Sequence, residues 1–329
     1  MATIRDVANL AGVSTTTVSY ALNKPDRVTD ELRLRVEEAV RALNYRPDGP
    51  ARALRTGHSH LVSLVVPDVA THFYAAMARG VADTIKSRGL HVVVGSTDAE
   101  AAEEVYFLEE SALQRAAGII VVPFRLTPDQ VLDACGRDVP IVVIGPRVGN
   151  VEIASIAHDD TGGVQQVVEH LLRQGRRRIA FISGLTDTPA SDRRHAGYLA
   201  AHEHFRIPID QRLHVTGDFK RTGGEQAMLE LLATGVDFDA VSAANDLMAI
   251  GAMRVLRRRG IRIPQDVAVV GYDDIDEAEI VEPALTTVRQ PAYEAGQLAA
   301  ELLLKHIDGA PQVHTHISIP TTLVVRESG

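Results

Sequence analysis

Residues 3–23, TIRDVANLAGVSTTTVSYALN, predict two short helices joined by a tight turn. The first helix has one apolar face at helical spacing, formed by Ile4, Val7, Ala8 and Ala11. Gly12 suits the turn because a residue without a Cβ atom tolerates positive φ. Ser14 is a favourable N-cap for the second helix, which we place at residues 15–22. The stretch therefore predicts a helix-turn-helix at the start of the chain.

The predicted second helix carries side chains suited to reading DNA. It buries Val18, Ala21 and Leu22 and exposes small hydroxyl residues and one tyrosine, namely Thr15, Thr16, Ser19 and Tyr20. Such side chains can reach base edges, a thymine methyl group or phosphate oxygens from the major groove. An ordinary helical hairpin of another kind of domain stays open as the alternative, since short helix pairs joined by glycine are common.

The order of residues in this stretch is more specific than its helical pattern. The string D-V-A-x-x-A-G-V-S-x-x-T-V-S-x-x-L-N resembles the N-terminal signature of the LacI/GalR family of bacterial transcription regulators. It is matched here by Asp6, Val7, Ala8, Ala11, Gly12, Val13, Ser14, Thr17, Val18, Ser19, Leu22 and Asn23. The resemblance implies a repressor that binds a pseudo-palindromic DNA operator as a homodimer and responds to a small-molecule effector. It implies DNA contacts from Thr3, Thr15, Thr16, Thr17, Ser19, Tyr20, Asn23 and Arg27.

The composition is that of an ordinary soluble protein with two or three domains. The chain has 329 residues, of which 45% are apolar and 23% charged. The net charge is −9, but residues 1–60 carry nine Lys and Arg against seven Asp and Glu, so only this segment is suited to face phosphate. No apolar run reaches the roughly 18 residues that span a bilayer, and we find no secretion signal. We therefore expect a cytoplasmic protein without a membrane partner.

We divide the sequence into a helix-turn-helix domain at residues 1–46, a linker at 47–60 and a body at 61–329. A third helix at residues 31–43, with Thr29 as its N-cap, completes the first domain. The composition of the linker alone favours a flexible tether. Its segment Ala51-Arg52-Ala53-Leu54 resembles the hinge helix of the family, however.

That resemblance implies that Ala53 and Leu54 contact the minor groove, where Leu54 wedges between base steps and bends the duplex. A helix this short is not stable alone, so we expect it to fold only on DNA and in a dimer. The approach Asp48-Gly49-Pro50 is less favourable to a helix than the family's usual sequence.

The body has an α/β pattern. We expect strands at residues 61–66, 91–95, 118–122 and 140–145, and then at 178–184, 214–216, 240–243 and 267–272. Helical stretches separate them. Because the strands are short and continuously apolar, we expect burial on both faces of parallel sheets. The predicted architecture is two doubly wound lobes, an N-lobe at about 61–158 and 289–319 and a C-lobe at about 159–288 and 320–329.

Segments spread along the body extend the resemblance. They include ANDLMAIG at 244–251, VGYDD at 270–274 and PALTTVRQP at 283–291. The body of these regulators is similar to a periplasmic sugar-binding protein, with two lobes, three crossover strands and a ligand cleft between the lobes. In open α/β sheets, ligands bind beyond the carboxyl ends of the strands.

The candidate effector site combines this rule with the resemblance. Its residues are Phe73, Arg194, Phe219, Asn245, Asp246, Asp273 and Gln290. A guanidinium offers a planar fork for vicinal hydroxyls or a carboxylate. Helix capping is the alternative role for Asp246, and core packing is the alternative for Phe73, which follows Thr71-His72 where the family commonly has Asn-Pro. A sugar or sugar derivative is our first choice of effector, and a nucleoside or nucleobase the second.

The sequence disfavours two other functions, those of an enzyme and of a solute-binding receptor. An enzyme is disfavoured because no P-loop, G-x-G-x-x-G, G-x-S-x-G or H-E-x-x-H motif is present. We predict no metal and no cofactor, since Cys135 is the single cysteine and His202-Glu203-His204 lacks a third spaced ligand. A solute-binding receptor without a DNA role is the remaining alternative, and the helix-turn-helix pattern argues against it.

Overall fold

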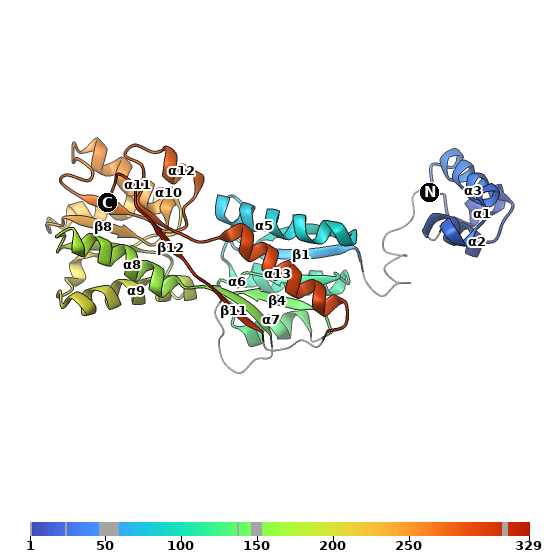
Figure 1. Cartoon of the computed structure of the whole chain (residues 1–329), viewed down its shortest axis with the longest axis horizontal. Helices are drawn as coiled ribbons and strands as arrows, with labels where there is room; N and C mark the ends of the chain where they lie inside the picture. The colour runs from blue at the N-terminus through green and yellow to red at the C-terminus, as the bar shows by residue number, and fades with distance from the viewer. Residues whose placement is uncertain (1, 24, 46–58, 137, 146–152, 311–314) are drawn as a thin grey trace. The chain divides into compact units, whose positions relative to one another are not determined.

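The computed structural model describes residues 2–23, 25–45, 59–136, 138–145, 153–310 and 315–329. The chain divides into two compact units, Met1–Ser59 and His60–Gly329 (Figure 1). The predicted hinge helix, with Ala53 and Leu54, lies outside the described residues.

The described part of the N-terminal unit is a helical bundle with the predicted caps. It contains α1 (Ile4–Ala11), α2 (Thr15–Asn23), a 3-10 turn (Pro25–Arg27) and α3 (Asp30–Ala42). Ser14 Oγ accepts from the Thr17 N–H at 3.0 Å, and Gly12 ends α1 at φ 63°. The helices share a small core of Val7, Ala8, Ala11, Val18, Ala21, Val36 and Ala39. The predicted helix-turn-helix is confirmed.

The N-lobe is built on a parallel sheet with the order β11-β5-β4-β3-β1-β2. The strands are β1 (Leu61–Val66), β2 (His91–Ser96), β3 (Gly118–Val121), β4 (Ile141–Ile144), β5 (Ala154–His158) and β11 (His316–Ile319). Neighbouring residues of β3 face opposite layers. Ile120 belongs to the core under α5 (His72–Ile85) and α13 (Ala292–Ile307), and Ile119 to the core under α6 (Ala101–Leu113) and α7 (Pro128–Cys135).

The C-lobe has a second parallel sheet, in the order β7-β6-β8-β9. Its strands are β6 (Ile179–Ser183), β7 (His214–Thr216), β8 (Ala240–Ala243) and β9 (Ala268–Val270). Its helices are α8 (Asp160–Arg173), α9 (Pro189–Phe205), α10 (Arg221–Ala233), α11 (Asp246–Arg258) and α12 (Asp276–Ile280). β10 (Thr287–Arg289) pairs antiparallel with β12 (Thr322–Val324). Between the lobes the chain runs from β5 to α8, from β10 to α13 and from β11 to β12 (Figure 1).

The structure adds elements to those predicted, among them β5 and α13, and corrects one expectation. β5 reads A-S-I-A-H and has little β propensity of its own, but it is paired on both sides. α13 was not predicted, although the apolar residues Ala295, Ala299 and Leu303, which are buried in the structure, have helical spacing in the sequence. The expectation that every strand is buried on both faces is wrong for β2, where Val93 is 49% exposed, because β2 is an edge strand.

Candidate functional site: a cavity between the two lobes

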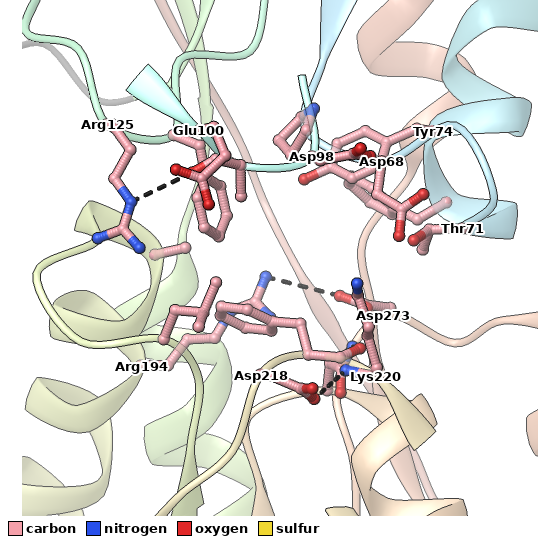
Figure 2. Close-up of a pocket in the computed structure, with 18 residues that line it drawn as sticks. Asp68, Thr71, Tyr74, Asp98, Glu100, Arg125, Arg194, Asp218, Lys220 and Asp273 are labelled. Carbon is pink, nitrogen blue, oxygen red and sulfur yellow. Dashed lines mark hydrogen bonds and ion pairs between the residues drawn. The ribbon is translucent and has the colours of Figure 1, made fainter. Parts of the chain in front are cut away.

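A cavity of about 280 Å³ lies between the N-lobe and the C-lobe. In Figure 2 its labelled side chains form two groups that face each other across the space. At least one lining residue follows each of β1, β2, β3, β7, β8 and β9, for example Asp68, Asp98, Arg125, Asp218, Asn245 and Asp273. The cavity therefore lies at the carboxyl ends of parallel strands, where open α/β sheets bind ligands.

Arg194, on α9, is the buried cation of the C-lobe wall and is 7% exposed. Its Nε donates to Asp160 Oδ1 at 3.2 Å, its Nη1 donates to the Ala244 carbonyl at 2.5 Å, and its Nη2 lies 3.5 Å from Asp273 Oδ1. The guanidinium also lies 4.2 Å from the centroid of the Tyr272 ring. Burial disfavours the charged form of Asp160, yet the adjacent Arg194 helps to hold its pKa below the ordinary value. These contacts fix the plane of the guanidinium at the cavity.

Three of the four remaining polar candidates, Asp273, Gln290 and Asp246, differ in whether they line the cavity. Asp273 lines the cavity and accepts from Gln290 Nε2 at 2.6 Å. Burial raises the pKa of Asp273 to about 6, while Arg194 acts to lower it. Gln290 does not line this cavity, and neither does Asp246, which is 0% exposed. The Asp246 carboxylate accepts from Thr287 Oγ1 at 2.5 Å and from the Ile275 N–H at 3.0 Å. It therefore joins α11 to β10 instead of facing a ligand.

Aromatic rings cover both sides of the cavity. Phe219 stands at φ 64°, and a Cβ atom at Gly184 would lie 1.9 Å from Phe219 Cζ, so glycine is required under this ring. Asn245 caps α11 and donates from Nδ2 to the Phe219 carbonyl at 2.8 Å, which fixes the loop. Phe73 and Tyr74 line the N-lobe side, with ring centroids 5.2 Å apart.

The loop after β3 reaches across the cavity. Glu104, 1% exposed, accepts from the N–H groups of residues 124–126 at 2.9 to 3.1 Å. Arg125 Nη1 then donates to the Thr186 carbonyl of the C-lobe at 2.9 Å. Phe124 meets Phe219 edge-on, with centroids 5.7 Å apart. One buried carboxylate thus positions two contacts between the lobes.

A further contact between the lobes involves the residue that departs from the family's usual Asn-Pro. His72 Nδ1 on α5 lies 2.8 Å from Glu277 Oε2 on α12. Burial raises the pKa of Glu277. The hydrogen bond with His72 and other contacts lower it by more, so the pKa lies below its ordinary value.

The predicted DNA-contacting residues lie mostly on or beside α2. Thr3, Thr15, Thr16, Tyr20 and Arg27 are exposed, and Thr17 and Ser19 are half-buried. Two of these side chains already take part in contacts at the N-terminal ends of helices. Thr3 Oγ1 lies 2.8 Å from Asp6 Oδ2, and Thr17 Oγ1 lies 2.9 Å from Ser14 Oγ. The side chain of Asn23 lies outside the described set.

Comparison with known proteins identifies the family. Residues 3–48 match the family described as bacterial regulatory proteins, lacI family, and residues 168–329 match a periplasmic binding protein-like domain. The transcriptional regulator GalR of Salmonella typhimurium (strain SL1344) is 38% identical over 331 residues, covering 100% of this chain and 96% of GalR. The chain belongs to the LacI family of bacterial regulatory proteins.

Two solved structures of transcriptional regulators share the fold. The Lac repressor dimer bound to operator and the anti-inducer ONPF matches with a TM-score of 0.86 and 29% identity, over 99% of this chain and 98% of that one. The complex of the regulator CelR with cellobiose matches with a TM-score of 0.76 and 36% identity, over 100% of both chains.

These matches confirm the predicted fold class and the role of a DNA-binding transcriptional regulator. The relatives are transcriptional regulators and not enzymes. In the described part of this LacI-family chain, no group of three or more His, Cys, Asp or Glu residues could hold a metal ion. A search of the same residues found no helix with the length and apolar character needed to cross a membrane.

The cavity of this LacI-family regulator also contains charged residues that sequence reasoning missed. They are Asp68, Asp98, Glu100, Arg125, Asp218 and Lys220. The signal was available, because Asp68 and Asp98 come two and three residues after predicted strands and Glu100 and Lys220 each precede a helix. Applying the rule about strand ends to every predicted strand of both lobes would have found them.

Proposed function

We propose that this regulator is a repressor that binds a pseudo-palindromic operator as a homodimer and is switched by an uncharged sugar held between the lobes. The lining of the interlobe cavity carries the proposal. Carboxylates such as Asp68 and Asp98 accept hydrogen bonds and the Arg194 guanidinium donates them, so several hydroxyl groups can be satisfied together. The Phe219 ring can cover the apolar face of a pyranose. The bound cellobiose of the similar CelR complex supports the same ligand class.

The charge of the cavity supports an uncharged effector. Its lining includes five carboxyl groups, from Asp68, Asp98, Glu100, Asp218 and Asp273, against the cations Arg125, Arg194 and Lys220. An excess of negative charge opposes an anionic ligand such as a phosphorylated sugar.

On the DNA side, we propose that α2 reads the major groove while Ala53 and Leu54 contact the minor groove, with Leu54 as a wedge. The exposed hydroxyls of Thr15 and Thr16 support the first role. We also propose that the protein works in the cytoplasm and catalyses no reaction.

The switch follows from the contacts between the lobes. A sugar that bridges the two walls stabilises the closed arrangement in which Arg125 reaches Thr186. It thereby shifts the population of the DNA-competent dimer. Linkage requires operator DNA to change effector affinity by the same factor.

The test combines two measurements on the full chain. Thermal melts with neutral sugars, phosphorylated sugars and nucleosides identify the ligand class, because a ligand that binds the folded state raises the melting temperature. An operator selected from random duplexes is then titrated with and without that ligand. We expect a neutral sugar to stabilise the protein and to change operator affinity, and Leu54→Ala to weaken operator binding more than binding to random DNA. A rise in melting temperature with nucleosides alone contradicts the sugar effector. Equal losses of affinity for operator and for random DNA in Leu54→Ala contradict the wedge role of Leu54.

A further inference from the structure

A second, smaller cavity adjoins the interlobe cavity. Its volume is about 70 Å³, against about 280 Å³ for the larger space. Phe73, Tyr74, Phe124 and Arg194 are among the residues that line both, so the two cavities are adjacent. The smaller cavity has about a quarter of the volume of the larger one, so it suits a substituent of a sugar and not a second sugar ring.

His158 gives this cavity a polar end. It is the last residue of β5, which lies between β11 and β4 in the N-lobe sheet. Its Nε2 atom is buried and has no hydrogen-bond partner among the residues that the structure describes. An unpaired nitrogen at this depth costs free energy, which a ligand group can recover.

The protonation of His158 decides which group fits. Burial lowers the pKa of His158 to about 4, so the imidazole is neutral at physiological pH. The Pro291 backbone, whose only polar group is a carbonyl oxygen, acts on this pKa as a hydrogen-bond acceptor. A neutral imidazole that carries its proton on Nδ1 leaves Nε2 as an acceptor. Arg193 and Arg194 line the same cavity and offer donors.

We propose that this cavity is a subsite for the exocyclic hydroxymethyl group of the effector, with the hydroxyl donating to His158 Nε2. A hydroxymethyl group has the required size and supplies one donor and one acceptor. The subsite selects sugars that contain a hexose over the corresponding pentose sugars. The inference rests on the proposed function, because it specifies which uncharged sugars the interlobe cavity takes.

The test uses pairs of sugars that differ in the hydroxymethyl group. D-glucose is compared with D-xylose, D-galactose with L-arabinose, and cellobiose with xylobiose, by thermal melts and calorimetry on the full chain. We expect the hydroxymethyl-bearing member of the recognised pair to bind at least about tenfold more tightly, as the loss of one well-made hydrogen bond in a buried site predicts. Equal affinities within the recognised pair overturn the subsite alone. If no sugar binds, the proposed function fails and the inference falls with it.

Two substitutions assign the preference to His158. His158→Phe fills the cavity and removes the acceptor, and we expect it to abolish the preference within the pair. His158→Ala removes the acceptor without added bulk, and it gives the same readout where the Phe variant does not fold by circular dichroism. His214→Phe is the matched control, because His214 Nε2 is also buried without a partner in the described residues but lines neither cavity. A preference that survives in a folded His158 variant overturns the proposal.

Discussion

The two walls of the interlobe cavity are built in different ways. On the C-lobe wall, Arg194 and Asp273 are 7% and 8% exposed, and the contacts of Asp160, Ala244 and Gln290 hold them. On the N-lobe wall, Asp68 is half-buried, and Asp98 and Glu100 are exposed. The first wall is a fixed polar network, whereas the second consists of loop residues, of which Phe124 and Arg125 are positioned by Glu104.

This difference separates two properties of the site. A buried network is expensive to break because it leaves uncompensated charges, so changes in the C-lobe wall should alter the stability of the fold together with ligand binding. Exposed loop charges contribute little to stability. Changes in the N-lobe wall should therefore act mainly on the closure of the lobes around the effector.

The largest effect is expected from Arg194→Met. The substitution leaves Asp273 buried without its cation and removes one of the partners of Asp160. We expect a loss of about 3–5 kcal/mol in the free energy of unfolding, measured in urea, and loss of the effector response. Arg193→Met is the matched control, because the Arg193 side chain also binds Asp160 but is 28% exposed. Equal losses of stability in the two variants would contradict the argument that burial makes the Arg194 charge costly to remove.

A pH dependence of the C-lobe wall comes next. The folded pKa of Asp273, about 6, lies above its unfolded value of 3.8. The native state therefore holds the proton more tightly, and the stability contributed by Asp273 falls as the pH rises from about 4 to 6 and is constant above. Asp273→Asn cannot titrate, and its amide keeps nearly the size and shape of the carboxyl group.

We expect the stability of the wild type relative to Asp273→Asn to fall by up to about 3 kcal/mol between pH 4 and pH 7, at about 1.4 kcal/mol for each unit of pKa shift. Urea unfolding at several pH values measures this difference. A difference that stays constant over the range would show that Arg194 keeps Asp273 ionised throughout.

On the N-lobe wall, Glu104→Gln should have a smaller effect on stability and a clear effect on binding. The variant keeps one acceptor oxygen, and its amide group turns donors toward the N–H groups of residues 124–126. We expect a loss of about 2 kcal/mol in stability. Effector affinity should fall because Arg125 is no longer positioned. Glu103→Gln, on the exposed face of the same helix, should change neither quantity. Unchanged affinity in Glu104→Gln would remove the loop after β3 from the closure.

The two walls also differ in how far the sequence predicts them. The C-lobe residues Arg194, Asn245 and Asp273 come after strands that the apolar sequence predicts clearly, and they are in motifs that resemble the family. All three line the cavity. Asp246 is in the same motif as Asn245 but faces away from the cavity. Which side of the start of α11 faces the cavity depends on how β10 packs against it. Sequence spacing does not contain that information.

His158, which lines the smaller cavity on the N-lobe side, was missed for a different physical reason. β5 was not predicted because A-S-I-A-H carries a single β-branched residue. Its position in the sheet depends on pairing with β11, which lies more than 150 residues away in the chain. Without β5, His158 could not be placed at a strand end. Long-range pairing of this kind is set by tertiary contacts and leaves little local signal.

The smallest predicted effect belongs to the contact between His72 and Glu277. Their side chains are 61% and 23% exposed, so the 2.8 Å contact is well solvated. A double-mutant cycle with His72→Ala and Glu277→Ala should give a coupling energy of about 0.2–1 kcal/mol. Because the pKa of Glu277 is lowered in the folded state, the coupling should be present above pH 4.5 and be lost as the pH falls through that lowered value. Salt at 1 M, with a Debye length of about 3 Å, should remove most of it. A coupling well above this range that persists in 1 M salt would mean that this side of the cleft contains a buried pair like that of Arg194, and the contrast between the two walls would no longer hold.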